Sequence, residues 1–224
     1  MSYNDVDVLI KQATPDLTAH VQDNPLLSAL SAGQAGSAQV AQIVLGEFHA
    51  HAAEVAAFAT MAARYPVQPV SGYFVDLARL VLDCDAPLLA CAEALGWGEK
   101  ELRSRELPNG MREFGSFMSW LAMRAGPAEA ACAVRADLLL WCGTCAALTE
   151  ELERQEAPMP QPVIDYFSLF QTAPERFIEE AREVAAYGLA RGEAPALVEQ
   201  GIAQVEPVLS RFWAAAVQPC PAAP

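Results

Sequence analysis

The sequence is poor in positive charge and in the residues that build strands. Its 224 residues include 14 Lys and Arg against 28 Asp and Glu, which gives a formal net charge of −14 at pH 7. Nucleic acids and anionic membranes bind proteins that present a positive face, so we expect neither as a partner. β-branched residues are few and alanine is abundant, a composition that favours helices over strands. The sequence therefore predicts an all-α protein.

Long apolar runs are also missing. A helix that spans a bilayer needs about 20 predominantly apolar residues, and Gln, Asp, Glu or Arg interrupts every candidate run. The first residues, Met-Ser-Tyr-Asn-Asp-Val-Asp, are acidic where a secretion signal would be basic. We therefore expect a soluble, cytoplasmic protein.

Cysteine is present but not in a disulfide pattern. The six cysteines lie mostly inside apolar segments of a long chain, which favours reduced thiols used as small core residues. Cys142 and Cys145 have the spacing of a redox pair, but they lie in the middle of an apolar helix rather than at a helix start, so we expect them to pack in the core.

Apolar residues recur at helical spacing along most of the chain, and proline or glycine separates the segments. One domain is expected over residues 1–217, followed by a Pro/Ala-rich tail at 218–224. The expected helices are 15–32 with a bend or a restart at Asn24-Pro25, 37–64, 73–95, a segment that carries Phe114 to Leu121, 128–153 with Pro127 at the first helical position, 163–169 continuing as 174–191, and 195–217.

Asp137 is the only charged residue between Ala136 and Ala147. A helix with this composition cannot keep the carboxylate fully in water, so the group must find a cation, hydrogen-bond donors or a proton. An ion pair with Arg135 or Arg124 is the structural interpretation, and a place in a functional site is the other.

Four segments in the same order resemble the TenA/thiaminase II family. The opening Asn24–Gly33 resembles that family's His-Pro-Phe segment and glycine turn, and 117–129 its aromatic helix, turn and acidic helix start. Residues 136–141 fall where the family has Pro-Cys-x-x-x-Tyr, and 212–216 resembles its terminal Phe-Trp-Asp-Met-Ala. The resemblance implies a heme-oxygenase-like helical bundle that binds a small molecule among its central helices. It also implies a homodimer or homotetramer, and a heteromeric partner is possible.

The residues that carry thiaminase chemistry are replaced at the matching positions. The family's nucleophilic Cys would fall at Asp137, the aromatic residue four positions on at Trp141, and the pyrimidine-binding Asp at Glu47. The family's catalytic Glu would fall at Leu209, and a Tyr that follows the Asp becomes Ala50. Hydrolysis at a pyrimidine methylene needs a covalent or strongly activated nucleophile, so thiaminase activity is not expected.

Glu47, His51 and Glu54 share one face of the 37–64 helix, and His49 points elsewhere. This face offers one His and two carboxylates, and no His follows residue 51 to complete the ligand set of a non-haem diiron site. Haem would need a proximal His from the first helix, where only His20 is available. We expect no metal and no other cofactor.

Glu47 and Asp137 are the predicted catalytic pair. Glu47 has apolar neighbours on its helix, and the resemblance places it in the pocket. If both carboxylates face one aromatic-walled cavity, they would attract a cationic amine and take its proton. The residues expected to bind the substrate are Phe48, His51, Phe114, Trp141, Tyr166 and Trp213.

The sequence thus suggests a cofactor-independent acid/base enzyme of specialised metabolism that forms or breaks a C–N bond of a small amine. The most concrete version is an intramolecular cyclisation, such as aziridine-type ring closure, with loss of an anion that Arg64, Arg124 or Arg135 would receive. The alternatives are a non-catalytic subunit that binds a ligand or another protein, and a non-haem iron oxygenase.

Overall fold

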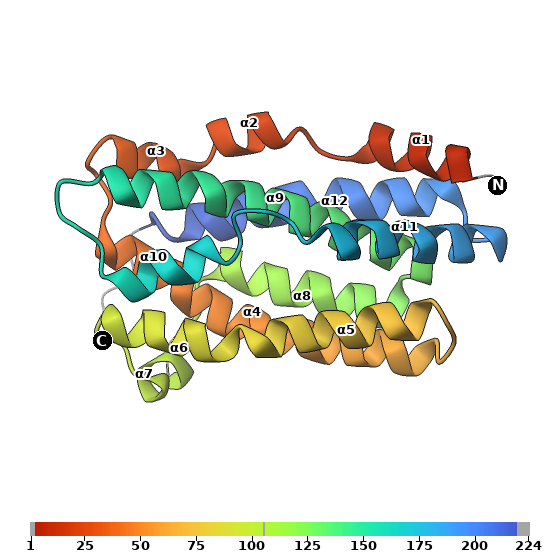
Figure 1. The fold of residues 1–224 in the computed structure, drawn as a ribbon, viewed down its shortest axis with the longest axis horizontal. Helices are drawn as coiled ribbons and strands as arrows, with labels where there is room; N and C mark the ends of the chain where they lie inside the picture. The colour runs from red at the N-terminus through yellow and green to blue at the C-terminus, as the bar shows by residue number, and fades with distance from the viewer. Residues whose placement is uncertain (1–2, 105, 219–224) are drawn as a thin grey trace.

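Twelve helices, most of them aligned along one long axis, make up the part of the chain that the computed structural model describes, residues 3–104 and 106–218 (Figure 1). No strand occurs in these ranges, so the all-α prediction is confirmed. The helices are α1 (Tyr3–Ala13), α2 (Leu17–Gln22), α3 (Pro25–Ser31), α4 (Ser37–Arg64), α5 (Val70–Asp83), α6 (Asp85–Ala94), α7 (Glu99–Ser104), α8 (Asn109–Arg124), α9 (Pro127–Arg154), α10 (Gln161–Ser168), α11 (Glu175–Ala190) and α12 (Pro195–Ala215).

The helix α9 lies in the middle of the bundle. It packs against α11 and α12 along much of its length and also contacts α10, α2 and α3, while α4 packs against α5 and α8 (Figure 1). By length and composition α9 is the one described helix that could cross a membrane, but 61 % of its most apolar window is buried inside the protein. This burial fits the core helix of a soluble protein.

Local sequence signals explain where several helices begin. The Asp16 side chain accepts hydrogen bonds from Thr18 N and Ala19 N at the start of α2, and Asn24 caps α3 in the same way ahead of Pro25. Helix α9 begins at Pro127, whose fixed φ suits a first helical position. The free N–H groups of its first turn donate to the distant Glu193 carboxylate.

Some expected boundaries were wrong. The segment 73–95, predicted as one helix, is divided into α5 and α6 at Cys84. At Asn24-Pro25 the chain restarts as the separate helix α3, so of the two expected outcomes, a bend or a restart, the restart is confirmed. Helices α1 and α7 were not predicted; both are short, and α7 is polar as well. The tail expected at 218–224 lies, beyond Gln218, outside the described residues.

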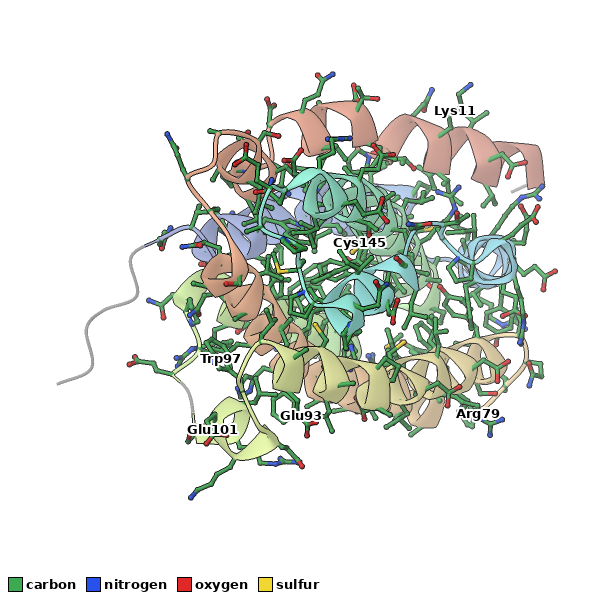
Figure 2. The ribbon with its side chains drawn as sticks, turned by 60° about the vertical axis from the view of Figure 1, so that its left-hand side comes forward. Lys11, Arg79, Glu93, Trp97, Glu101 and Cys145 are labelled. Carbon is green, nitrogen blue, oxygen red and sulfur yellow. The ribbon has the colours of Figure 1, made fainter. Side chains whose placement is uncertain are left out.

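The described cysteines are all free thiols, as expected. Figure 2 shows Cys145 in the interior of the bundle, whereas charged residues such as Lys11 and Glu101 extend from its surface. Cys142 is buried as well, so the redox-pair interpretation has no support from its position. The sixth cysteine, Cys220, lies outside the described residues.

Candidate functional site

A cavity of about 110 Å³ lies between α4, α5, α9 and α12. An engineered protein cavity of about 150 Å³ holds benzene, so this one suits a molecule of only a few non-hydrogen atoms. The segment that joins α10 to α11 supplies the exposed Leu169 and Thr172, which mark the side open to solvent. The lining residues are Glu47, His51, Glu54, Leu80, Val81, Cys84, Phe114, Asp137, Leu138, Trp141, Cys142, Leu169, Phe170, Thr172, Pro174, Leu209 and Phe212.

The predicted pair therefore meets in one cavity, Glu47 from α4 and Asp137 from α9. His51, Phe114 and Trp141 line the same cavity. Helices α4, α8 and α9 border the cavity from different sides, and the fold so brings together side chains that are far apart in the sequence.

Glu47 is buried and has one hydrogen-bond donor. The hydroxyl of Tyr166 donates to Glu47 Oε2 at 3.2 Å. Burial raises the pKa of Glu47 to about 8; the hydrogen bond from Tyr166 opposes this rise, and the negative charge of Asp137 adds to it. Loss of water is the dominant cause because the ionised form gains only one donor in return.

Asp137 is buried, and one of its two carboxyl oxygens has no hydrogen-bond partner among the residues that the structure describes. No hydrogen bond reaches its Oδ1, and burial raises its pKa from 3.8 to about 7. The first of the two interpretations, an ion pair with Arg135 or Arg124, is wrong: no ion pair between Asp137 and an arginine occurs in the described ranges, and Arg135 instead donates to Thr14 Oγ1 on the far side of α9. Asp137 lines the cavity, which agrees with the second interpretation, a place in a site.

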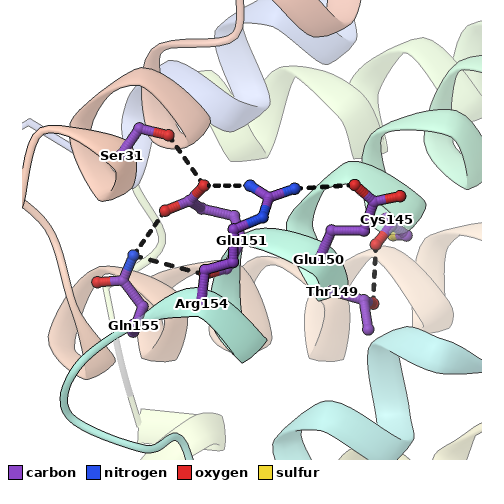
Figure 3. Close-up of polar contacts among 7 residues, drawn as sticks. All are labelled: Ser31, Cys145, Thr149, Glu150, Glu151, Arg154 and Gln155. Atoms are coloured by element: carbon purple, nitrogen blue, oxygen red, sulfur yellow. Dashed lines mark hydrogen bonds and ion pairs between the residues drawn. The ribbon is translucent and has the colours of Figure 1, made fainter.

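Glu151, another buried carboxylate of α9, shows what a structural role looks like (Figure 3). It accepts hydrogen bonds from Ser31 Oγ at 2.9 Å, Arg154 Nη1 at 2.9 Å and Gln155 Nε2 at 2.7 Å. Every part of this carboxylate has a donor, whereas Asp137 on the same helix has none for its Oδ1.

Glu54 is a third carboxyl group of the cavity. It lies two turns beyond Glu47 on the same face of α4, and burial raises its pKa well above the usual value, together with the charges of Asp137 and Glu47. Glu54 was expected on the same face as Glu47, but it was not among the predicted site residues. The spacing to Glu47 was the signal that could have included it.

The thiols of the cavity are not activated. Burial raises the pKa of Cys84 to about 11 and that of Cys142 to about 12, with nearby carboxylates adding to each rise. Nucleophilic attack by cysteine requires the thiolate. Neither residue is therefore suited to the covalent chemistry of a cysteine hydrolase.

His51 connects the cavity with its outer wall. Its Nδ1 lies 2.8 Å from Asp85 Oδ1, and its Nε2 lies 3.4 Å from the Tyr166 hydroxyl and 3.9 Å from Glu47 Oε2. Burial lowers the pKa of His51, and the hydrogen bond to Asp85 opposes that change. Asp85 was not singled out from the sequence.

Stacked aromatic rings form one wall. Trp141 faces the cavity and packs on Trp213 behind it, with ring centroids 4.8 Å apart. Trp213 is fully buried and does not line the cavity. The expectation that it contacts the substrate is therefore wrong for this cavity, and its ring instead supports Trp141 from behind. Tyr166 does not line the cavity either; its hydroxyl donates a hydrogen bond to Glu47, which does.

Phe48 lies outside the cavity. Its ring is half-buried, with the Arg103 guanidinium 5.3 Å from its centroid. It lies one residue after Glu47 and so points to another side of α4. The expectation that it binds substrate is wrong for this cavity.

The arginines expected to receive an anion are also elsewhere. Arg64 donates to the backbone oxygen of Ala125 at 3.2 Å, Arg124 is exposed, and no Lys or Arg occurs among the described residues that line the cavity. In the described part of the chain, no group of three or more His, Cys, Asp or Glu is arranged to hold a metal ion. His20, the candidate haem ligand, has its Nδ1 3.1 Å from Glu206 Oε1.

Comparison with known proteins gives a structural likeness only. No protein-family model and no curated protein sequence matches the chain. Among solved structures, a TenA homologue from P. horikoshii OT3 matches 94 % of this chain and 97 % of its own, with a TM-score of 0.74 and 11 % identity. The protein has a TenA-like fold. A TenA homologue from Pseudomonas syringae pv. tomato str. DC3000 matches 96 % of this chain and 91 % of its own, with a TM-score of 0.70 and 11 % identity.

The TenA-like fold confirms the architecture that the resemblance implied, and at this identity it establishes the fold alone. Asp137 and Leu209, where the resemblance would place a Cys and a Glu, both line the cavity. The expected oligomer, the cytoplasmic location and the roles of the site residues stay predictions.

Proposed function

We propose that the protein is an acid/base enzyme, working without a cofactor, that binds a small amine in this cavity and forms or breaks one of its C–N bonds. The observation that carries the proposal is the convergence of Glu47 and Asp137 in an apolar cavity, where Asp137 Oδ1 has no partner. Buried carboxylates are normally paired with a cation or several donors. An ammonium group in the cavity would supply both.

Charge and shape favour an amine over an anion. Three carboxyl groups and no Lys or Arg line the described cavity, and the rest of the lining is mostly apolar or aromatic, including Trp141 and Phe212. Aromatic faces attract cations in addition to the carboxylates. A small primary or secondary amine with a short hydrocarbon part matches this environment.

The two carboxyls also have the proton affinities that acid/base chemistry needs. With the pKa of Glu47 at about 8 and that of Asp137 at about 7, the pair holds both a proton and a negative charge near neutral pH. One group takes the proton from the amine as its nitrogen attacks, and the other donates a proton to the departing group. A proton donor thus takes the place of the arginine that the sequence analysis expected for the leaving group.

Ring closure is the concrete reaction that we propose. The bound ammonium first gives a proton to one carboxylate, and the freed nitrogen lone pair then attacks a carbon of the same molecule. The new C–N bond forms as the bond to the leaving group breaks, and the other carboxyl donates a proton to the departing group. A specialised metabolic pathway is the setting in which such amines occur. The rigid wall of Trp141 and Trp213 would hold the chain folded for attack.

The first test measures binding at pH 7.5. We expect propylamine and 1,4-diaminobutane to bind, and the matched alcohol propanol to bind at least about tenfold more weakly. Glu47→Gln and Asp137→Asn should each lower amine affinity by about tenfold or more, since a charged hydrogen bond contributes about 1.5–3 kcal/mol. Glu151→Gln, which changes a buried carboxylate outside the cavity, is the matched control and should keep the affinity.

The second test measures product formation. Purified protein is incubated with small amines that carry a leaving group two carbons from nitrogen, and cyclic products are sought by mass spectrometry. Tight binding without product from any of them would refute the catalytic part of the proposal. It would favour the non-catalytic ligand-binding alternative, which the replacement of the thiaminase residues also fits. Stoichiometric iron that survives chelation would instead favour an oxygenase.

A further inference from the structure

His51 lies between a solvent-facing carboxylate and the buried end of the cavity. Its Nδ1 is 2.8 Å from Asp85 Oδ1, and its Nε2 is 3.4 Å from the Tyr166 hydroxyl. That hydroxyl is 3.2 Å from Glu47 Oε2. A continuous row of hydrogen-bonding atoms therefore joins Asp85 to Glu47.

Exposure changes sharply along this row. The Asp85 side chain is 51 % exposed, that of His51 8 % and that of Glu47 9 %, and Tyr166 is fully buried. One end thus contacts bulk water and the other reaches the cavity. His51 thus has an exposed carboxylate at Nδ1 and a carboxyl of the cavity near Nε2. Packing alone does not require this arrangement of a buried histidine.

Three separate elements supply the row. Glu47 and His51 are one turn apart on α4, Tyr166 comes from α10, and Asp85 is the first residue of α6. The break between α5 and α6 at Cys84 turns the chain so that Asp85 lies against α4, and α10 packs on α6. The one helix that the sequence predicted over this region would not have had that break.

We propose that Tyr166, His51 and Asp85 form a proton relay between Glu47 and solvent. The proposal rests on the proposed function, in which Glu47 takes a proton from the amine and must release it. The relay gives that proton a path that does not cross the cavity while a ligand fills it.

The transfer balances at every step. When Glu47 is ionised, the Tyr166 hydroxyl donates to it; once Glu47 is protonated, the hydroxyl turns to donate to His51 Nε2 and accepts from the Glu47 carboxyl. The O–H bond of protonated Glu47 then breaks as its proton moves to the Tyr166 oxygen, and the Tyr166 hydroxyl proton moves to His51 Nε2. The Nδ1 proton of His51 then moves to the Asp85 carboxylate, which releases a proton to water. The net change is one proton from Glu47 to solvent, with the His51 proton moved from Nδ1 to Nε2; the reverse sequence carries a proton inward and restores the starting tautomer.

The protonation states suit this transfer. Burial lowers the pKa of His51, which keeps the imidazole neutral and able to accept at one nitrogen and donate at the other. Burial raises the pKa of Tyr166 well above its usual value, so a phenolate is unfavourable there. The hydroxyl must therefore accept one proton at the same time as it gives up the other. The other titratable groups that face the row are Glu54 of α4, Cys84 and Cys91 beside and within α6, and Asp137 and Cys145 of α9.

The test measures proton exchange in the full-length protein without ligand. Carbon-13 NMR of labelled side-chain carboxyls gives the rate at which Glu47 exchanges its proton near its own pKa of about 8. We expect His51→Gln and Asp85→Asn each to slow this rate at least about tenfold while Glu47 still titrates. Asp85→Asn alters a half-exposed side chain, so it tests the relay even where the buried His51→Gln destabilises the fold.

Matched controls exclude a general structural effect. His49→Gln lies on another face of α4, and Asp83→Asn changes an exposed carboxylate just before the break; both should leave the Glu47 rate unchanged. Asp137 provides an internal control, since the row does not reach it. An unchanged Glu47 rate in both relay variants, or an equal slowing of Glu47 and Asp137, would overturn the proposal. Amine binding is measured separately, so its failure would count against the proposed function and not against the relay.

Discussion

Replacing Asp137 by asparagine should make the protein more stable, and increasingly so as the pH rises. The folded protein keeps the Asp137 proton until about pH 7, whereas the unfolded chain loses it near 3.8. Folding therefore takes up a proton between these values, and the free energy of unfolding falls as the pH rises through this range. The asparagine amide does not ionise, so Asp137→Asn removes this part of the pH dependence.

The size of the effect follows from the same two values. Each tenfold difference in proton affinity corresponds to about 1.4 kcal/mol. A pKa that rises from 3.8 to about 7 therefore costs the folded state about 4 kcal/mol at pH 8.5. About half of this cost is already present at pH 5.5, so the stabilisation by asparagine should grow by about 2 kcal/mol between the two pH values. Burying the asparagine amide also has a free-energy cost, but that cost does not depend on pH, so it changes the stability difference at pH 5.5 and at pH 8.5 by the same amount.

The assay is urea denaturation of both proteins at pH 5.5, 7 and 8.5. Glu151→Gln serves as the opposite case, because it removes a fully bonded carboxylate and should destabilise the protein by about 1–3 kcal/mol. A stability difference between wild type and Asp137→Asn that stays constant with pH would show that this carboxyl does not carry the proposed burial cost. The argument for an unpaired acid in the cavity would then fail.

Three other substitutions or reactions test single contacts. Tyr166→Phe removes the donor to Glu47 and should raise the pKa of that carboxyl further, measured by carbon-13 NMR titration. Gly46→Ala places a methyl group 2.6 Å from the Phe212 ring, so it should destabilise the protein by about 1–3 kcal/mol in urea denaturation and weaken propylamine binding as the ring shifts toward the cavity. Burial raises the pKa of Cys84 to about 11, so iodoacetamide at pH 7.5 should alkylate it far more slowly in native than in urea-unfolded protein, measured by mass spectrometry.

Helices whose signals are local were predicted well from the sequence. Helix α4 runs from Ser37 to Arg64 as expected, because apolar residues repeat every three or four positions between a glycine turn and Tyr65-Pro66. Helix α9 begins at Pro127, the residue expected at its first helical position. In both segments the periodicity and the flanking breakers are sufficient to define the helix.

The break at Cys84 was missed because the apolar pattern continues through it. Pro87 was the available signal, since proline is tolerated in the first turn of a helix but disrupts its interior. Recognising that α6 starts at Asp85 would have identified the residue that bonds His51. The bond itself depends on how α4 and α6 pack, and no local pattern records that.

The candidate site was predictable only in part for the same reason. The isolation of Asp137 in an apolar run showed that it would be buried, but its distance from any arginine depends on which way α9 turns in the bundle. Helix geometry places Asp137 toward the cavity and Arg135 toward the opposite side, where it meets Thr14. Phe48 was expected among the aromatic residues of the pocket, but it follows Glu47 directly and therefore points to another side of α4.

The energetics of the cavity argue that it evolved around an occupant. Glu47, Glu54 and Asp137 all have raised pKa values, which means that each makes the empty fold less stable when ionised. Apolar residues of similar size at these positions would remove that cost, as they commonly do for unpaired buried charges. A cation in the cavity makes the ionised carboxylates stabilising instead of destabilising, because it lowers all three pKa values. The free energy gained on binding grows with the size of these pKa shifts. The same groups that weaken the ligand-free protein therefore strengthen amine binding, and amine affinity should rise as the pH increases toward 8.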